Sequence, residues 1–537
     1  MKSVIPAPHK LKFSPITVFT FICLLFTSTI LLSHPYPHLL GELEGAYSHP
    51  YPPPPAGGEL EGAAPNILLI ISDDLNTRIG PYMDIDKHTP HLDRLANEGV
   101  QFTRAYCQFP LCGPSRASFM SGLYPATNGV LRNNDQPGSY KKETPALANH
   151  PSMAGFFREN GYFTARVSKI YHMGVPGGIE RGEPGGDEPD SWDYSYNVMG
   201  PETLSPGELE LLSPKNPHYG GNFSRMVIPD KYENTQTDYL AASQAIAILE
   251  NRAGEIPKEG TNKQRIKKDA PFFLAVGFVR PHVPLIAPEN CFVPYPENEV
   301  ILPPVRIGKD VPEEALRRQN EKVFGMSKTQ QRRTISSYMA SVRFMDQQVG
   351  RLLDALDRLD LRQETIVIFL SDHGYNLGEH DCWSKISLWE GSVRIPLIFS
   401  VPGQENNYGT TSDNITELID LYPTLTELCG FKEQEPRILQ GKSLAGYISN
   451  SATKNNSDFA YTVSYGGNAA SVRTDKYRYT RWGDYPEIDN EELYDHEKDP
   501  EEHFNMADDA NYKKVLTEMR HKFETAREKA RTGLEGI

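Results

Sequence analysis

The chain lacks an excess of positive charge and is poor in cysteine. Its 537 residues include 55 Lys and Arg against 70 Asp and Glu, which gives a formal net charge of −15. Nucleic-acid-binding proteins usually present a basic face, so we expect no nucleic-acid partner. An anionic substrate would instead have to meet a local positive pocket. The six cysteines form no C-x-x-C pair, which argues against a structural zinc site.

The number of cysteines predicts one unusual thiol. Cys23 lies in an apolar N-terminal segment, and the cysteines that remain are Cys107, Cys112, Cys291, Cys382 and Cys429. An odd number in a secreted chain implies that one thiol is left over or modified, and Cys112 is the candidate. The sequence does not say whether the others pair.

The N-terminus has the pattern of a secretory signal. Lys2, Lys10 and Lys12 precede an uncharged run over residues 16–32. Residues 1–33 therefore form a signal peptide or, because the run approaches the length of a membrane span, an uncleaved signal anchor. A buried helix is the third reading. We expect contact with a membrane only if the anchor is retained.

Residues 34–65 form a Pro/Gly-rich repeated linker. HPYP and GELEGA each occur twice in this segment, which has too few apolar residues to pack. Glycosylation sequons at Asn222, Asn414 and Asn455 agree with passage through the secretory pathway. The expected location is therefore lysosomal or extracellular.

Strand and helix patterns alternate from residue 66 onward. Apolar runs predict strands at 66–72, 100–103, 163–167, 272–278, 365–370 and 397–401. Amphipathic patterns and caps predict helices near 89–98, 152–160, 239–251, 335–359 and 418–428. Residues 174–232, rich in Gly, Pro and Asp, read as surface loops.

This alternation predicts the α/β fold class. We expect a large, mostly parallel central sheet flanked by helices in a catalytic domain at 66–450. Antiparallel strands within 470–482 and a helix near 515–531 predict a smaller C-terminal α+β subdomain at 451–537.

The stretch C-G-P-S-R-A-S-F-M-S-G, residues 112–122, predicts a short helix that ends at Gly122. Cys112 would then lie at the helix N-terminus, where unpaired N–H groups favour an anion. Arg116 adds a planar fork of donors suited to sulfate or phosphate. Taken alone, the same residues fit a cysteine packed as a small hydrophobic residue equally well.

Acidic and imidazole side chains follow two of the predicted strands. Asp73 and Asp74 end the first, and Asp372 and His373 follow the strand at 365–370. Side chains at the carboxyl ends of parallel strands lie in the crevice where open α/β sheets bind substrates. A set rich in carboxylates suits a hard divalent ion, calcium more readily than zinc.

Longer motifs give these pairs their context. The chain reads, in order, NILLIISDDL, CGPSRASFMSG, GYFTARVSKIYH, VGFVRPHVP, SDHGYNLGEHDCWSK, SVRTDKYRYT and ELYDHEKDPEEHFN. Over roughly residues 65–510 it resembles the type I sulfatases of the alkaline phosphatase superfamily, and most of all the iduronate-2-sulfatase branch. In that family the motif cysteine is oxidised to formylglycine by a formylglycine-generating enzyme.

The resemblance implies roles for residues that mean little alone. Asp73, Asp74, Asp372 and His373 would hold one Ca²⁺, with the modified Cys112 completing the set. Arg116 and Lys169 would stabilise the formylglycine hydrate. His172 would take a proton when sulfate is released. His282 and Lys385 would bind sulfate oxygens, and one of them would protonate the leaving alcohol.

Several positions depart from the family pattern. Ser168 replaces a usual glycine before Lys169, Ser121 replaces a threonine, and Tyr375 replaces the tryptophan of the iduronate branch. Residues 124–127 read Y-P-A-T where that branch tends to read R-P-D-T. These positions border the sugar-binding end of the site, so they bear on substrate identity.

The expected activity is hydrolysis of sulfate esters on a sulfated glycan, with 2-O-sulfated iduronate in heparan or dermatan sulfate as the best single substrate. Glycosaminoglycan degradation in the lysosome or outside the cell would follow. Two alternatives remain among enzymes: a sulfatase of another specificity, or a phosphodiesterase of the same superfamily. A third is a non-catalytic glycan-binding protein on a sulfatase scaffold.

Overall fold

The computed structural model describes residues 64–83, 88–218, 221–253, 270–450, 459–483 and 490–534. These described residues belong to one compact unit. The predicted signal segment, nearly all of the predicted linker and the sequon at Asn455 lie outside the described residues. Within the described ranges, no helix combines the length and the apolar character needed to cross a membrane.

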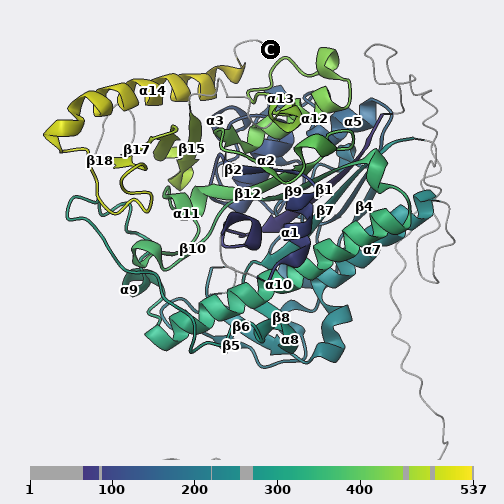
Figure 1. The fold of residues 1–537 in the computed structure, drawn as a ribbon, viewed down its shortest axis with the longest axis horizontal. Coiled ribbons are helices and arrows are strands. Elements are labelled where there is room, and N and C mark those ends of the chain that lie inside the picture. The colour runs from purple at the N-terminus through teal and green to yellow at the C-terminus, as the bar shows by residue number, and fades with distance from the viewer. Residues whose placement is uncertain are drawn as a thin grey trace, which may run out of the picture. The chain divides into compact units, whose positions relative to one another are not determined.

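The large sheet runs in the order β13-β2-β12-β9-β1-β7-β3-β4, with β14 also paired to β2 (Figure 1). Its strands are β1 (Asn66–Asp73), β2 (Val100–Tyr106), β3 (Phe163–Ser168), β4 (Tyr194–Tyr196), β7 (Phe272–Pro281), β9 (Thr365–Ser371), β12 (Arg394–Ser400), β13 (Thr410–Ser412) and β14 (Thr416–Glu417). Strands β9, β1, β7, β3 and β4 are mutually parallel, and β12 is antiparallel to both β9 and β2. The prediction of a mostly parallel sheet is confirmed.

Helices cover both faces of this sheet, and every side chain of its central strand is therefore buried. In β1, Leu68 and Ile70 belong to the cluster formed with α1 (Pro90–Asn97), α7 (Thr237–Ala253) and α10 (Lys328–Arg358). Its alternate residues pack with α2 (Cys112–Ser121), α5 (Met153–Glu159) and α12 (Leu421–Leu428). A strand buried on both faces reads as a continuous apolar run, which is why the sequence marked it so clearly.

Some element boundaries differ from the predicted ones. Helix α10 begins at Lys328, well before the apolar stripe, because Ser327 and Gln330 form a capping box there. Residues 174–232 are not loops throughout, since they include α6 (Gly177–Glu180), β5 (Glu210–Leu211) and β6 (Ser224–Ile228). Strand β6 pairs in parallel with β8 (Leu285–Pro288) in a three-stranded sheet.

Shorter elements complete the part before residue 450. They are α3 (Pro125–Asn128), α4 (Ser139–Glu143), α8 (Glu289–Phe292), α9 (Asn320–Val323), β10 (Asn376–Leu377), β11 (Trp383–Ser384), α11 (Glu390–Val393) and α13 (Ala445–Ser449). Strands β10 and β11 form a small antiparallel hairpin.

A second sheet forms the predicted smaller C-terminal subdomain. Strands β15 (Ala460–Ser464), β16 (Ala469–Arg473), β17 (Tyr477–Trp482) and β18 (Asn490–Asp495) are antiparallel in sequence order. Helix α14 (Lys513–Arg531) packs on this sheet through Leu516, Met519 and Phe523, and Figure 1 shows it in yellow beside β15 and β17. The boundary predicted at residue 450 stays a prediction.

The cysteines past residue 64 are all free thiols, and all are buried. The odd count therefore does not reflect disulfides around one spare thiol. Asn222 and Asn414 are also buried, and their side-chain amides donate hydrogen bonds to Pro217 and Ser412. A glycan at either position would have to displace these bonds.

A buried ionic network connects the C-terminal sheet to the large one. Arg478 of β17 forms ion pairs with Glu390 of α11 and with Glu502. The His496 Nε2 atom lies 2.8 Å from Glu502, and the backbone N–H of Glu390 donates to Glu502 at 2.8 Å. Although burial alone would raise it, Arg478 and His496 lower the pKa of Glu502 to about 2. The network therefore holds two carboxylates ionised between two packed layers.

We expect Arg478→Met to lower the free energy of unfolding at pH 7 by about 3–5 kcal/mol, because it removes the cation that Glu390 and Glu502 share and leaves them with His496 and Arg473. The folded pKa of Glu502 lies below the ordinary value of 4.5, so its pairing stabilises the protein above that value and is lost as pH falls toward 2. The deficit of the variant should therefore shrink in urea denaturation at pH 3. Arg520→Met is the control, since Arg520 pairs with Glu491 at the surface and should cost less than about 1 kcal/mol. Equal losses in the two variants would contradict the prediction.

Candidate active site

Cys112 is the first residue of α2, which follows β2 after a short turn. The helix ends as the sequence predicts, with Gly122 in the left-handed conformation at φ 71°. The Cys112 Sγ atom lies 3.0 Å from Lys385 Nζ and 3.4 Å from His373 Nε2. Burial would raise the pKa of the thiol, but Lys385, Lys169 and His373 together lower it well below its ordinary value.

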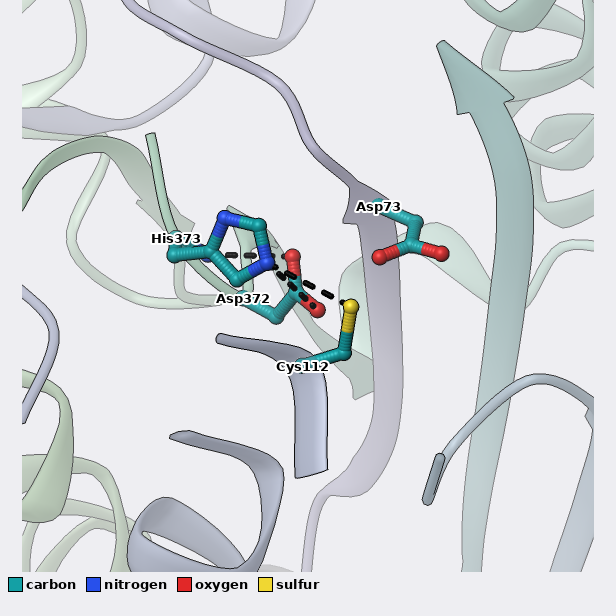
Figure 2. A group of neighbouring side chains, drawn as sticks. All are labelled: Asp73, Cys112, Asp372 and His373. Atoms are coloured by element: carbon teal, nitrogen blue, oxygen red, sulfur yellow. Dashed lines mark hydrogen bonds and ion pairs between the residues drawn. The ribbon is translucent and has the colours of Figure 1, made fainter. Parts of the chain in front are cut away.

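The acidic residues come from neighbouring parallel strands. Strands β1 and β9 pair in register up to Ser72 and Ser371, so Asp73 and Asp372 leave the same edge of the sheet side by side. Asp74 takes a positive φ of 65°, which turns the chain into the loop after β1. Figure 2 shows Asp73, Asp372, His373 and Cys112 gathered around one point, and their ligand atoms lie within 4.8 Å of one another.

The orientation of His373 is fixed by its backbone. Its Nδ1 lies 2.9 Å from the Gly374 carbonyl oxygen and donates to it, which directs Nε2 toward Asp74 Oδ1 at 3.3 Å and Asp372 Oδ2 at 3.7 Å. Burial opposes the charged ring, but Asp372 and Cys112 raise the pKa of His373 to about 9. Burial also raises the pKa of Asp372 to about 6. Binding of a cation by these groups would release protons.

Buried cations surround the carboxylates. Arg116 Nε donates to Asp372 Oδ2 at 2.9 Å, and its Nη2 lies 3.6 Å from Asp73 Oδ1. Lys169 forms an ion pair with Asp73, and Lys385 Nζ donates to Asp74 Oδ1 at 2.6 Å. The attraction between these cations and carboxylates thus offsets the free-energy cost of burying the charges.

Lys169 reaches Asp73 because the chain turns sharply after β3. Ser168 has a φ of 61°, a left-handed conformation that favours glycine, which is the usual family residue there. On β7, a side-chain carbon at Gly277 would lie 2.0 Å from the Lys169 carbonyl oxygen. The close approach of the two segments requires a glycine at 277.

Two histidines complete the cluster. The His172 Nε2 atom lies 3.3 Å from Asp135 Oδ1, and contacts with Asp135 and Cys112 raise the pKa of His172 against the effect of burial. His282 donates through Nδ1 to the Val283 carbonyl at 2.7 Å, and its Nε2 lies 3.8 Å from Asp74 Oδ2. Sequence reasoning missed Asp135, which lies in a polar loop without a motif.

The structure brings together every residue that the sequence analysis placed in the site. These are Asp73, Asp74, Cys112, Arg116, Lys169, His172, His282, Asp372, His373 and Lys385. Segments up to 311 residues apart in the chain contribute to it.

The donor atoms fit a divalent metal ion. Asp73 Oδ1, Asp73 Oδ2 and Asp74 Oδ2 are buried and accept no hydrogen bond, although Arg116 and Lys169 form ion pairs with Asp73. Buried carboxylate oxygens without hydrogen bonds are costly unless a cation lies against them. Together with the His373 Nε2 atom, these oxygens form a set that could hold one ion.

Fold and site together describe a hydrolase for an anionic ester. Cys112, at a helix N-terminus, faces carboxylates that could hold a metal ion, and lysine and histidine side chains surround both. Such an arrangement binds an anionic group and stabilises the charge that develops during its transfer.

Comparison with known proteins identifies the class of ester. The family model described as Sulfatase matches residues 65–431, and one described as N-sulphoglucosamine sulphohydrolase, C-terminal, matches residues 378–529. The chain belongs to the sulfatase family and is a sulfuric ester hydrolase with the alkaline phosphatase-like fold.

Individual relatives are similar to this chain over most of its length. A sulfatase of Formosa agariphila is 32% identical over 84% of this chain and 85% of its own length. The iduronate 2-sulfatase of Homo sapiens is 32% identical over 68% of this chain and 69% of its own length. The structure of a phosphonate monoester hydrolase of Agrobacterium radiobacter, 21% identical, has a TM-score of 0.66 and covers 87% of this chain and 96% of its own.

We expect a divalent cation to stabilise this site measurably. After chelation, added Ca²⁺ should raise the thermal unfolding midpoint of the wild type, since a ligand at a hundred times its Kd contributes about 2.7 kcal/mol. Asp372→Asn should abolish this response. Asp346→Asn is the matched control, because Asp346 is a buried carboxylate of α10 that accepts from the backbone of His91 and Leu92. The cation site would be misassigned if Asp372→Asn responded like the wild type.

Proposed function

We propose that this protein hydrolyses sulfate esters of a sulfated glycan, with Cys112 oxidised to formylglycine and one Ca²⁺ in the site. The observation that carries the proposal is the convergence of Cys112, two carboxylate-bearing strand ends and the Lys385 ammonium on one buried point. The family supplies the reaction class, and the charges of this site supply the means to bind its substrate.

The proposed substrate is 2-O-sulfated iduronate in heparan or dermatan sulfate. The 32% identity to human iduronate 2-sulfatase supports it, as does the resemblance of the motifs around Cys112 and Asp372 to those of the iduronate branch. A chain of net charge −15 would repel such a polyanion at long range. Binding therefore has to rely on the local cluster of Arg116, Lys169 and Lys385.

The chain's own side chains would divide the work as follows. Lys385 and His282, which both lie against Asp74, would bind sulfate oxygens, and one of them would protonate the leaving alcohol. Arg116 and Lys169 would hold the residue at position 112 in place and offset charge beside it. His172, oriented by Asp135, would take a proton at position 112 so that sulfate can leave.

Two groups that the chain would acquire complete the proposal. Asp73, Asp74, Asp372, His373 and the residue at 112 would hold Ca²⁺, which supplies Lewis-acid polarisation of the sulfate oxygens. The oxidised Cys112 would supply a hydrated aldehyde, whose second hydroxyl gives the bound sulfate a route of release that a thiol lacks.

A sulfatase of other specificity is the main alternative. Tyr375 and the segment at 124–127 depart from the iduronate branch. Tyr375 is buried, and it lies close enough to Asp74 and Lys385 for their charges to affect its pKa. A phosphodiesterase and a non-catalytic glycan-binding scaffold are less well supported, because the cysteine motif and all the metal-binding side chains are present.

We place maturation and action in the secretory pathway. The signal pattern of residues 1–33 would bring the chain to a formylglycine-generating enzyme before folding closes the site. Delivery to the lysosome or outside the cell would then expose it to glycosaminoglycans. Membrane attachment would require that the N-terminal segment is not cleaved.

We expect formylglycine at position 112 in protein from cells that contain the modifying enzyme. Cleavage after Arg104 and Arg116 gives one peptide, AYCQFPLCGPSR, with both Cys107 and Cys112. After reduction, mass spectrometry should show an alkylating label at Cys107, while position 112 should react as an aldehyde. Cys107 is the internal control. A peptide alkylated at both positions in active enzyme would rule out the formylglycine mechanism.

Lys385→Ala and His282→Ala should each lower kcat for release of sulfate on the order of a hundredfold, because both contact charge that develops in the transition state. Lys432→Ala and His521→Ala are matched surface controls and should retain wild-type rates. If a site variant changes only KM, that residue binds sulfate and does not assist departure of the alcohol.

A further inference from the structure

Arg318 lies beside the site without a counter-ion. In the part of the chain that the structure describes, its side chain takes part in no ion pair and no hydrogen bond, and its Nε atom is buried. The guanidinium lies over the ring of Phe324, 5.1 Å from the centroid. Burial lowers the pKa of Arg318, against the smaller opposing effects of Tyr375 and Tyr465.

The position of Arg318 is tied to the hairpin that carries Lys385. Its carbonyl oxygen accepts from the backbone N–H of Trp383 at 3.1 Å, and the next residue, Gln319, bridges to Cys382. Lys385 follows this hairpin directly, and its ammonium lies 3.0 Å from Cys112 Sγ. The backbone at Arg318 is therefore joined to the hairpin that leads into Lys385.

Tyrosines connect Arg318 to the catalytic cluster. Burial raises the pKa of Tyr375, while Asp74, Lys385 and Arg318 all lie near enough to shift it. Tyr465 donates through its hydroxyl to the Ile386 carbonyl at 2.8 Å. The exposed Arg317 guanidinium lies over the Tyr465 ring, 5.0 Å from its centroid.

We infer that Arg318, with Arg317 beside Tyr465, forms a second anion subsite that takes another negatively charged group of the sulfated sugar. The inference rests on the proposed function and adds to it the requirement that the substrate carry a carboxylate or a second sulfate. A partly buried guanidinium without an anionic partner is unfavourable in the free enzyme. A bound anion would relieve that cost through paired N–H···O bonds, so charged substrates gain over neutral ones.

The geometry also predicts that the two arginines contribute differently to substrate binding. Arg318 is partly buried and held by the hairpin, whereas Arg317 is exposed and stacked on Tyr465. Charge-assisted bonds are stronger where water is excluded, so Arg318 should contribute most of the discrimination. Arg317 should mainly affect the approach of the substrate and show a stronger dependence on salt.

The test compares three substrates and the ratio of their kcat/KM values. The first is a 2-O-sulfated uronate disaccharide. The second is the same disaccharide with its carboxyl group reduced to an alcohol, and the third is the reduced form with a second sulfate added. Arg318→Met keeps the packing over Phe324 and removes the charge. We expect it to lower kcat/KM for the carboxylated substrate about ten- to a hundredfold and bring its ratio to the reduced form near one.

The third substrate identifies the anion. If Arg318→Met also loses the preference for the doubly sulfated sugar, the subsite accepts either group; if only the carboxylated substrate is affected, it is specific for uronate. Arg318→Lys should restore part of the preference. Arg306→Gln, at an exposed position of the same segment, should leave all ratios unchanged.

A stability measurement separates binding from a structural role. Removal of an unpaired, partly buried charge should leave the thermal unfolding midpoint equal or higher, while loss of a structural arginine would lower it. An unchanged substrate ratio in Arg318→Met, or a lower midpoint with all three substrates equally impaired, would overturn the subsite. Failure of the wild type to release sulfate from any of them would instead overturn the proposed function.

Discussion

The buried contact between Arg116 and the carboxylates of Asp73 and Asp372 is the constraint on which the rest of the site depends. Both carboxylates leave the sheet at the same edge because β1 and β9 are parallel and in register. Two like charges could not remain ionised there without Arg116 and Lys169, and these cations could not be buried without the carboxylates. The carboxylate oxygens of Asp73 and Asp74 that accept no hydrogen bond could then bind a metal ion.

The sequence predicted the elements of the site better than their surroundings. The strand ends at Asp73 and Asp372 were evident because strands buried on both faces read as apolar runs. The contact of Lys385 with Asp74 joins residues 311 apart, and no local pattern encodes it. The resemblance of a longer motif placed Lys385 in the site but did not predict this contact. Asp135 was missed because a polar loop gives no periodic signal, and Arg318 because its lack of a partner exists only in three dimensions.

The same distinction explains the errors in the fold. Helix α10 was predicted too short because its first turns are polar and are stabilised by a cap, which hydrophobic spacing does not report. Strand β12 was expected as a strand, but its direction depends on where the preceding loop returns to the sheet. The short strands β6 and β8 pair across 60 residues, so each alone resembles a loop. The odd number of cysteines did not indicate disulfides, because the thiols past residue 64 are free and pack as small apolar groups. The modification of Cys112 stays a prediction.

The electrostatics of the site argue for a nucleophile other than a thiol. Burial alone would raise the pKa of the Cys112 thiol, yet Lys385 and Lys169 lower it well below its ordinary value, so an unmodified Cys112 would be an anion paired with Lys385. A thiolate of low pKa is a weaker nucleophile than one of ordinary pKa. Its negative charge would also pair with the cations that an anionic ester needs for binding. A neutral hydrated aldehyde leaves them free until charge develops in the transition state. This difference in charge supports the proposal that Cys112 is oxidised before the enzyme acts on sulfate esters.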